Sequence, residues 1–260
     1  MVRYTSTSPF SPENCASAIT RTLRVNDILR GVGSATSRAL DFLFPRICVG
    51  CGRIGDYICV TCAAHMPLLH GPICPHCGQP QASGILCPLC AGQLSSISSI
   101  RSVFRFEGIV RAAIHELKYR NLRAIVPTLA AYLGAYALEN GTLADFVVPV
   151  PLHPQRQRRR GYNQAELLAR ELGYAQGTPA AVSSLKRTGG GASQVRTGSM
   201  SERRRNVADA FTCMDASFSG KRILLVDDVC TTGATLEACA VALRAAGASD
   251  VYGLTVAREV

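Results

Sequence analysis

The second half of the chain alternates between two kinds of hydrophobic pattern. Continuous apolar runs, which are typical of buried strands, occupy residues 103–106, 145–151, 222–228 and 250–258. Apolar residues recur at a helical period in residues 107–120, 163–173 and 234–247. Strands that alternate with helices in this way indicate an α/β fold, with a parallel sheet flanked by helices.

Some predictions about the helices concern single residues. The residues expected on buried helix faces are Ile109, Ala113, Ile114 and Leu117 in the first helix, and Leu236, Ala240 and Leu243 in the last. Gly173 and Gly247 are expected to end their helices, because glycine readily adopts the left-handed conformation that follows a helix.

The texture of the sequence divides the chain into three parts. Residues 1–37 are rich in Ser, Thr and Arg and are expected to form a flexible leader, with Val25 as an alternative start. Residues 38–95 form a small cysteine-rich module, and residues 96–260 carry the α/β pattern. At 260 residues and 47% hydrophobic, the chain is long and apolar enough for one or two domains with a packed core.

The charge of the chain favours anionic ligands. The net charge is +10, and arginines cluster at residues 156–160 and 203–205. Such a surface suits phosphate-bearing ligands or nucleic acid without choosing between them. No apolar stretch reaches the roughly 18 residues of a membrane span, and the N-terminus lacks a secretory signal. We therefore expect no membrane insertion and a cytoplasmic location.

The cysteines point to bound metal. Most of them lie in four pairs with two residues between the partners: Cys48 and Cys51, Cys59 and Cys62, Cys74 and Cys77, Cys87 and Cys90. This spacing lets both thiolates of a pair bind one ion, and two pairs complete a closed four-sulfur zinc site. Neighbouring pairs therefore predict two structural zinc ions, with metal-free thiols and iron–sulfur ligation as the alternatives.

An unusual stretch, ILLVDDVCTTGAT, covers residues 223–235. Asp227 and Asp228 follow a buried strand at its carboxyl end, where α/β sheets bind ligands. The Thr/Gly residues after them precede a helix, whose first backbone N–H groups attract phosphate. Carboxylates would repel that phosphate, so they must meet another part of the same ligand. Two acids beside a phosphate cradle suit the hydroxyls of a ribose 5-phosphate.

This stretch resembles the signature of type I phosphoribosyltransferases. Residues 115–120, 148–165 and 194–206 are similar to the ComF family, in which cysteine pairs precede a phosphoribosyltransferase domain. The resemblance covers residues 40–260. It implies a type I phosphoribosyltransferase-like sheet behind a double zinc ribbon, and binding of phosphoribosyl pyrophosphate (PRPP) with magnesium. Members of this family are associated with competence, the uptake of DNA for transformation.

The resemblance also assigns residues to the ligand. It makes Asp227 and Asp228 the catalytic acids that hold the ribose hydroxyls. It places the 5′-phosphate on a loop formed by Val229, Cys230, Thr231, Thr232, Gly233, Ala234 and Thr235, although Cys230 also suits a packed position.

Further residues are expected around the pyrophosphate. They are Arg160, Asn163 and Gln164, which follow the strand at residues 145–151, and Lys118, for which a plain surface position stays open. Residues 187–206 could close as a lid or form an inert loop. His115 and His153 are expected to be structural, and only Tyr119 and Tyr162 lie near enough to the motifs to stack on a base.

Three functions remain open at this point. The first is an enzyme that transfers phosphoribosyl from PRPP to a nitrogen nucleophile, with positioning and electrostatics supplied by the protein. The second is a PRPP sensor that binds single-stranded DNA through zinc ribbons and arginines. The third is an adaptor to the DNA-uptake machinery with a vestigial site, against which the intact acids and loop argue.

Overall fold

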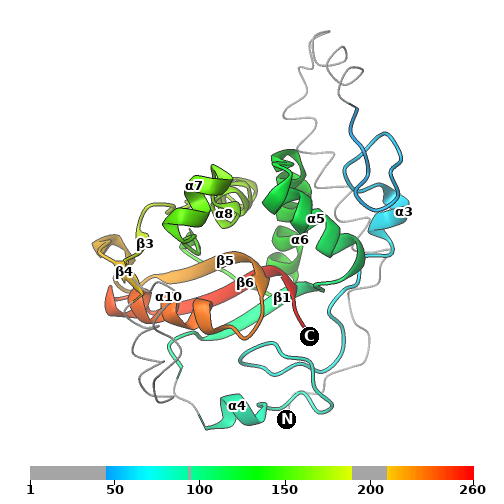
Figure 1. Ribbon diagram of the computed structural model, residues 1–260. Helices are drawn as coiled ribbons and strands as arrows, with labels where there is room; N and C mark the ends of the chain where they lie inside the picture. The colour runs from blue at the N-terminus through cyan, green and yellow to red at the C-terminus, as the bar shows by residue number, and fades with distance from the viewer. Residues whose placement is uncertain (1–44, 93–94, 189–209) are drawn as a thin grey trace, which may run out of the picture.

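In the computed structural model, which describes residues 45–92, 95–188 and 210–260, a four-stranded parallel sheet forms the centre of the C-terminal part (Figure 1). Its strands are, in spatial order, β1 (Ser99–Arg105), β6 (Asp250–Arg258), β5 (Arg222–Cys230) and β2 (Phe146–Pro149). All three pairings are parallel. The predicted parallel α/β sheet is confirmed, and its carboxyl edge collects the ends of all four strands.

Helices cover both faces of the sheet (Figure 1). One face carries α6 (Val126–Glu139) and α8 (Gln164–Gln176), and the other carries α10 (Ala234–Ala245) with the antiparallel pair β3 (Leu185–Arg187) and β4 (Phe211–Cys213). The remaining elements are α3 (Val60–Ala63), α4 (Pro88–Ala91), α5 (Gly108–Tyr119), η1 (Arg123–Ile125), α7 (Pro154–Arg160) and η2 (Ala216–Phe218). Within the described ranges, no helix has both the length and the apolar character needed to cross a membrane.

The two faces of the sheet have separate cores. The core beneath α5, α6 and α8 includes Leu117, Leu133 and Leu168, and it also contains Cys48 and Cys62 of the cysteine module. The core beneath α10 holds side chains such as Ile223, Leu225, Phe218 and Leu243. The first half of the cysteine module therefore packs into the main hydrophobic core.

Most of the helix predictions are confirmed, and two are wrong in detail. In α5, Val110 takes the fully buried place that the sequence assigned to Ile109, and Ile109 instead packs beside Gly50 of the cysteine module. Helix α8 continues past Gly173 and ends at Gly177, whose φ is 66°. Gly173 lies inside the helix, and glycine is required there because a Cβ would meet Thr178 O at 2.6 Å.

Several predictions lie outside the described residues. These are the flexible leader at residues 1–37, the arginines at 203–205 and nearly all of the lid expected at residues 187–206. The domain boundary near residue 95 also stays a prediction.

Candidate functional site

The eight paired cysteines form two tetrads, as predicted. The first tetrad is Cys48, Cys51, Cys59 and Cys62, and the second is Cys74, Cys77, Cys87 and Cys90; within each, all four sulfur atoms lie within 4.8 Å of one another. A regular tetrahedron with zinc–sulfur bonds of about 2.3 Å has sulfur–sulfur edges of about 3.8 Å. The observed Sγ–Sγ distances of 3.6 Å (Cys51–Cys59) and 3.7 Å (Cys77–Cys87) match that edge. Both tetrads thus fit one zinc ion each.

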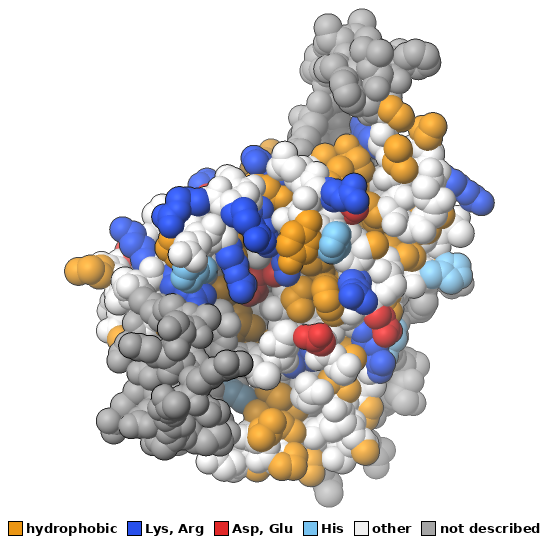
Figure 2. Space-filling view, in the orientation of Figure 1, with side chains coloured by type: hydrophobic (Ala, Val, Ile, Leu, Met, Phe, Trp, Pro, Cys, Tyr) orange, Lys and Arg blue, Asp and Glu red, His pale blue; other side chains and the backbone are white. Residues whose placement is uncertain are grey.

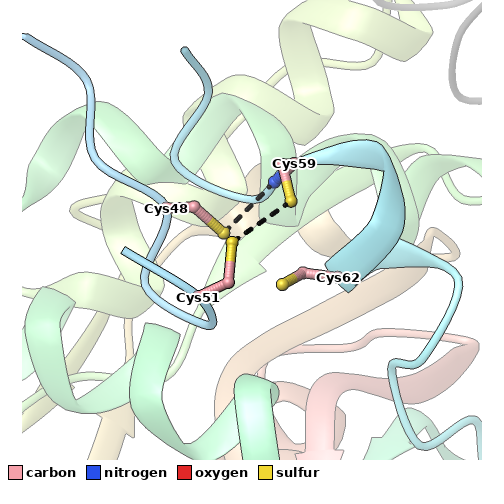
Figure 3. A group of neighbouring side chains, drawn as sticks. All are labelled: Cys48, Cys51, Cys59 and Cys62. Atoms are coloured by element: carbon pink, nitrogen blue, oxygen red, sulfur yellow. Dashed lines mark hydrogen bonds between the residues drawn. The ribbon is translucent and has the colours of Figure 1, made fainter. Parts of the chain in front are cut away.

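The two tetrads are built in the same way. In the first, the Cys59 amide donates to Cys48 Sγ at 3.4 Å (Figure 3). In the second, the Cys87 amide donates to Cys74 Sγ, also at 3.4 Å. Gly52 and Gly78 both adopt a φ of 73°, which turns the backbone beneath the sulfur atoms and favours glycine. The repeated geometry confirms the doubled module seen in the sequence.

In each tetrad, one cysteine has a lowered pKa that favours its thiolate form. Burial raises the pKa of Cys48, but backbone N–H donors outweigh burial and bring that pKa to about 6. The same balance brings the pKa of Cys74 to about 6. A thiolate is the form that binds metal, so this chemistry also fits a structural zinc site.

The acid pair, Asp227 and Asp228, lies near the carboxyl end of β5, as predicted. The strand continues to Cys230, so Val229 and Cys230 belong to β5 and not to a loop. Asp228 is only 3% exposed, and Lys118 Nζ of α5 lies 2.5 Å from its Oδ2. Asp228 is therefore buried beneath the end of α5, from which Lys118 reaches it. Lys118 therefore lies beside the acid pair and not in a plain surface position, while its contact with pyrophosphate stays a prediction.

Asp227 has a different environment from Asp228. It is partly exposed, and its Oδ1 accepts the Asp228 amide at 2.8 Å. Burial of the carboxyl group, followed by the charge of Asp228, raises the pKa of Asp227 well above its usual range. Lys118 acts in the opposite sense but does not cancel these effects. The pair is thus one ion-paired acid beside one acid that tends to hold its proton.

The Thr/Gly loop, residues 231–235, follows β5 and includes the first two residues of α10, so it presents an open helix N-terminus. Its N-cap residue, Gly233, has no side chain and a φ of 83°. Thr231, Thr232 and Thr235 are exposed, and Thr232 Oγ1 accepts the Ala234 amide at 3.3 Å. Exposed hydroxyls and first-turn amides of a 12-residue helix are suited to an anion. Cys230 is 2% exposed and takes the packed role that the sequence left open.

The segment after β2 lies next to the acid pair, because Val150 N donates to Val226 O of β5 at 2.9 Å. In the helices that follow, Arg160 donates to Gln164 Oε1. Asn163 is 6% exposed and fully engaged, since its amide group donates to Val150 O and accepts from Ala165 N. Asn163 therefore positions this segment, while contact of Arg160 and Gln164 with a ligand stays a prediction.

Two aromatic residues near the site differ sharply in exposure. Tyr162 is 7% exposed, donates its hydroxyl to Leu117 O and carries the Arg123 guanidinium 4.3 Å above its ring, so it is not open to a base. Tyr119 is 59% exposed, with the His115 ring 4.7 Å away. His153 caps α7 by accepting Gln155 N at 3.2 Å, in line with the structural role expected for it, whereas the same expectation for the exposed His115 stays a prediction.

One residue beside the site was missed by sequence reasoning. Arg258, at the end of β6, is 1% exposed and donates to Thr231 O of the Thr/Gly loop at 3.1 Å. The only signal in the sequence was a charged residue that ends a run of buried strand positions.

Comparison with known families finds both parts of the molecule. A family described as "Double zinc ribbon domain" matches residues 39–91, and one described as "Phosphoribosyl transferase domain" matches residues 158–258. A solved glutamine PRPP amidotransferase from B. subtilis is similar over 51% of this chain and 26% of its own, with 22% identity and a TM-score of 0.37.

Curated relatives match most of this chain. Competence protein F of Haemophilus influenzae is 33% identical over 195 residues, which is 72% of this chain and 85% of that protein. Competence protein ComFC of Bacillus subtilis is 27% identical, covering 78% and 85% of the two chains. DNA utilization protein YhgH of Salmonella typhimurium is 32% identical, covering 75% and 87%. With its double zinc ribbon ahead of a phosphoribosyltransferase domain, the chain belongs to the ComF family.

Proposed function

We propose that this protein binds PRPP with magnesium at the carboxyl edge of its sheet and serves DNA uptake in natural transformation. The observation that carries the proposal is the short span from the acid pair to the N-terminus of α10. It offers carboxylates to ribose hydroxyls and, a few residues on, hydroxyl and amide donors to the 5′-phosphate. The names of the competence relatives support the biological setting.

The charges around this span suit the rest of the ligand. Lys118 lies at the acid pair, and Arg160 approaches from the end of α7, where three consecutive arginines occupy the last turn. These cations would hold the pyrophosphate. Outside the cysteine tetrads, the described residues include no group of three or more close metal-ligating side chains. Magnesium would therefore arrive with the pyrophosphate oxygens, which is its usual mode in phosphate sites.

The same site would support transfer of the phosphoribosyl group. In that reaction the bond from ribose C1′ to pyrophosphate breaks, a nitrogen nucleophile bonds to C1′, and the nucleophile's proton leaves with a base or solvent. The residues above contribute positioning and charge stabilisation rather than a covalent step. Tyr119, which follows Lys118 in the chain and is 59% exposed, is the ring that we expect an acceptor base to meet.

Calorimetric titration with PRPP and magnesium tests the binding. Asp227→Asn combined with Asp228→Asn should abolish it, because both ribose contacts are lost. Asp250→Asn is the matched control: Asp250 also pairs with a cation, Arg244, but lies at the amino end of β6. Wild-type protein without affinity for PRPP, or a double variant with unchanged affinity, would refute the proposal. Pyrophosphate release, screened with free bases and single-stranded DNA, then tests transfer.

The outer face of α5 favours a second function, the binding of single-stranded DNA. Arg111, His115 and Tyr119 are exposed at intervals of four residues, so they share one face of the helix. The Arg160 guanidinium lies 5.7 Å from the centre of the Tyr119 ring. Figure 2 shows Lys and Arg side chains gathered over this side of the molecule around hydrophobic and His side chains. Aromatic rings among cations are what single strands need for stacking and backbone contact.

Anisotropy titration of a fluorescent oligothymidine tests this second function. Tyr119→Ala should weaken binding by about 1–3 kcal/mol, the usual worth of one stacked base. Tyr174→Ala should change nothing, because Tyr174 is 68% exposed but lies near the C-terminus of α8, away from the carboxyl edge. Equal effects of the two variants, or no binding by the wild type at low salt, would remove this function and leave the PRPP proposal untouched.

A further inference from the structure

Arg258 joins three parts of the fold that are distant in the sequence. Its backbone belongs to β6, where it pairs with Arg105 of β1 and Cys230 of β5. Its side chain leaves the sheet toward the second tetrad and donates from Nη2 to Cys77 O. From Nη1 it donates to Gln79 Oε1 at 3.2 Å and to Thr231 O at 3.1 Å. One guanidinium therefore holds both the second tetrad and the Thr/Gly loop.

The positive charge of Arg258 is buried, and among the described residues no carboxylate forms an ion pair with it. At 1% exposure its cation is removed from water, and none of the ion pairs among the described residues includes it. A buried charge without a partner is costly. A closed four-thiolate zinc site carries net negative charge, since four thiolates outweigh one Zn²⁺. The second tetrad is thus both the structural and the electrostatic partner of this arginine.

The second tetrad sits directly on the sheet next to Arg258. His76 O accepts the amide of Ile100 in β1 at 2.7 Å. A Cβ at Gly78 would lie 2.5 Å from Ile100 O, and a Cβ at Gly233 of the Thr/Gly loop would lie 2.8 Å from Ile100 Cδ1. Ile100 therefore packs between Gly78 and Gly233 and leaves no room for a Cβ at either position. A shift of the Cys74–Gly78 turn would therefore displace the Thr/Gly loop, both through the packing of Ile100 and through the hydrogen bonds of Arg258.

The first tetrad provides a contrast within the same molecule. It has the same internal geometry, yet it packs against α5, where Gly50 approaches Ile109. Of the two tetrads, Arg258 contacts only the second in the described residues, through Cys77 O and the neighbouring Gln79.

We propose that Arg258 is a positioning residue that couples metal binding at the second tetrad to the conformation of the Thr/Gly loop, and so to PRPP affinity. The identity of the ligand rests on the proposed function, whereas the coupling does not. Coupling of this kind is reciprocal, so PRPP should also retain metal at the second tetrad. The first tetrad should take no part in it.

Hydrogen exchange of the loop amides tests the coupling without any ligand. In the full chain, Cys77→Ser and Arg258→Met should speed exchange across residues 231–236 by about 10-fold. Arg258→Lys should behave similarly, because one ammonium cannot reproduce the forked contacts of the guanidinium. Cys51→Ser, which opens the first tetrad, is the matched control and should leave these amides unchanged. Amides of Leu224 and Leu225 in β5 report whether the sheet stays folded.

Zinc release supplies the second readout, followed with a chromogenic chelator. Cys51→Ser protein keeps only the second tetrad intact, and PRPP with magnesium should slow its zinc release about 10-fold. Cys77→Ser protein keeps only the first, and PRPP should have no effect. Equal loop exchange in the Cys51 and Cys77 variants would overturn the coupling even if Arg258→Met failed to fold. Wild-type protein that does not bind PRPP would instead refute the proposed function, with the exchange result still decisive here.

Discussion

The two neighbouring acids should respond to the same substitution in opposite directions. Asp228→Asn removes the partner of Lys118, whose side chain is 20% exposed, whereas that of Asp228 is 5% exposed. Breaking a fully buried pair costs about 3–5 kcal/mol, and water at the lysine should reduce that to about 2 kcal/mol. For a protein of this size, that loss lowers Tm by roughly 4–8 °C.

Asp227→Asn should instead stabilise the protein. Burial and the neighbouring Asp228 raise the pKa of Asp227, so its ionisation opposes folding at neutral pH. A raised pKa means that stability from this carboxyl is complete below its unfolded pKa of about 3.9 and is lost as pH climbs through the folded value. Asparagine does not ionise, so the variant should have a higher Tm than the wild type at alkaline pH. The gain should be smaller toward acidic pH.

Thermal denaturation of both variants and the wild type, followed by circular dichroism between about pH 5.5 and 8.5, gives the comparison; this range keeps the zinc sites loaded. Asp250→Asn reports the effect of neutralising an acid at the other edge of the sheet. The reasoning fails if both Asp227→Asn and Asp228→Asn lower Tm alike, or if the advantage of Asp227→Asn shrinks as pH rises.

Three further outcomes are expected. Metal analysis of purified protein should find two zinc ions per chain, and less than about one, or an iron chromophore, would contradict the tetrad chemistry. PRPP affinity should increase with pH, because Asp227 must lose its proton to accept hydrogen bonds from the ribose hydroxyls. Calorimetry in buffers of different ionisation enthalpy should show proton release on binding. An affinity that does not depend on pH would contradict that contact. Replacing Arg203, Arg204 and Arg205 by Ala should flatten the salt dependence of single-stranded DNA binding by up to about one unit per lost phosphate contact. If the triple variant loses PRPP and keeps DNA, those arginines serve the small ligand.

The order of strands and helices could be predicted because it depends on local periodicity. Each buried strand is a continuous apolar run, and the acids and threonines that follow β5 stand where parallel strands end. The cysteine tetrads could also be predicted from the sequence, since a two-residue spacing lets both sulfurs of a pair bind one ion. These parts of the fold and site need only the order of residues along the chain.

The remaining features depend on contacts between distant segments. Nothing near Lys118 in the sequence shows that α5 ends over β5 and gives this lysine a buried acid as its partner. Tyr162 and Tyr119 are the same residue type and lie close together in the sequence, which does not show that they differ in exposure. Tyr162 is buried through its contacts with Arg123 and Leu117. Arg258 looked like the polar end of a strand, and the second tetrad decides that it is buried. Exposure and charge pairing are tertiary properties, which periodicity does not encode.

The strand order also has a consequence for synthesis on the ribosome. β1 lies beside β6, which is made last among the strands, so the sheet cannot be completed until β6 emerges. At about 5–20 residues per second, β1 waits on the order of 10 s without its partner. The second tetrad precedes β1 in the chain and bonds to it through His76 and Ile100. The second tetrad can therefore contact β1 before β6 is made.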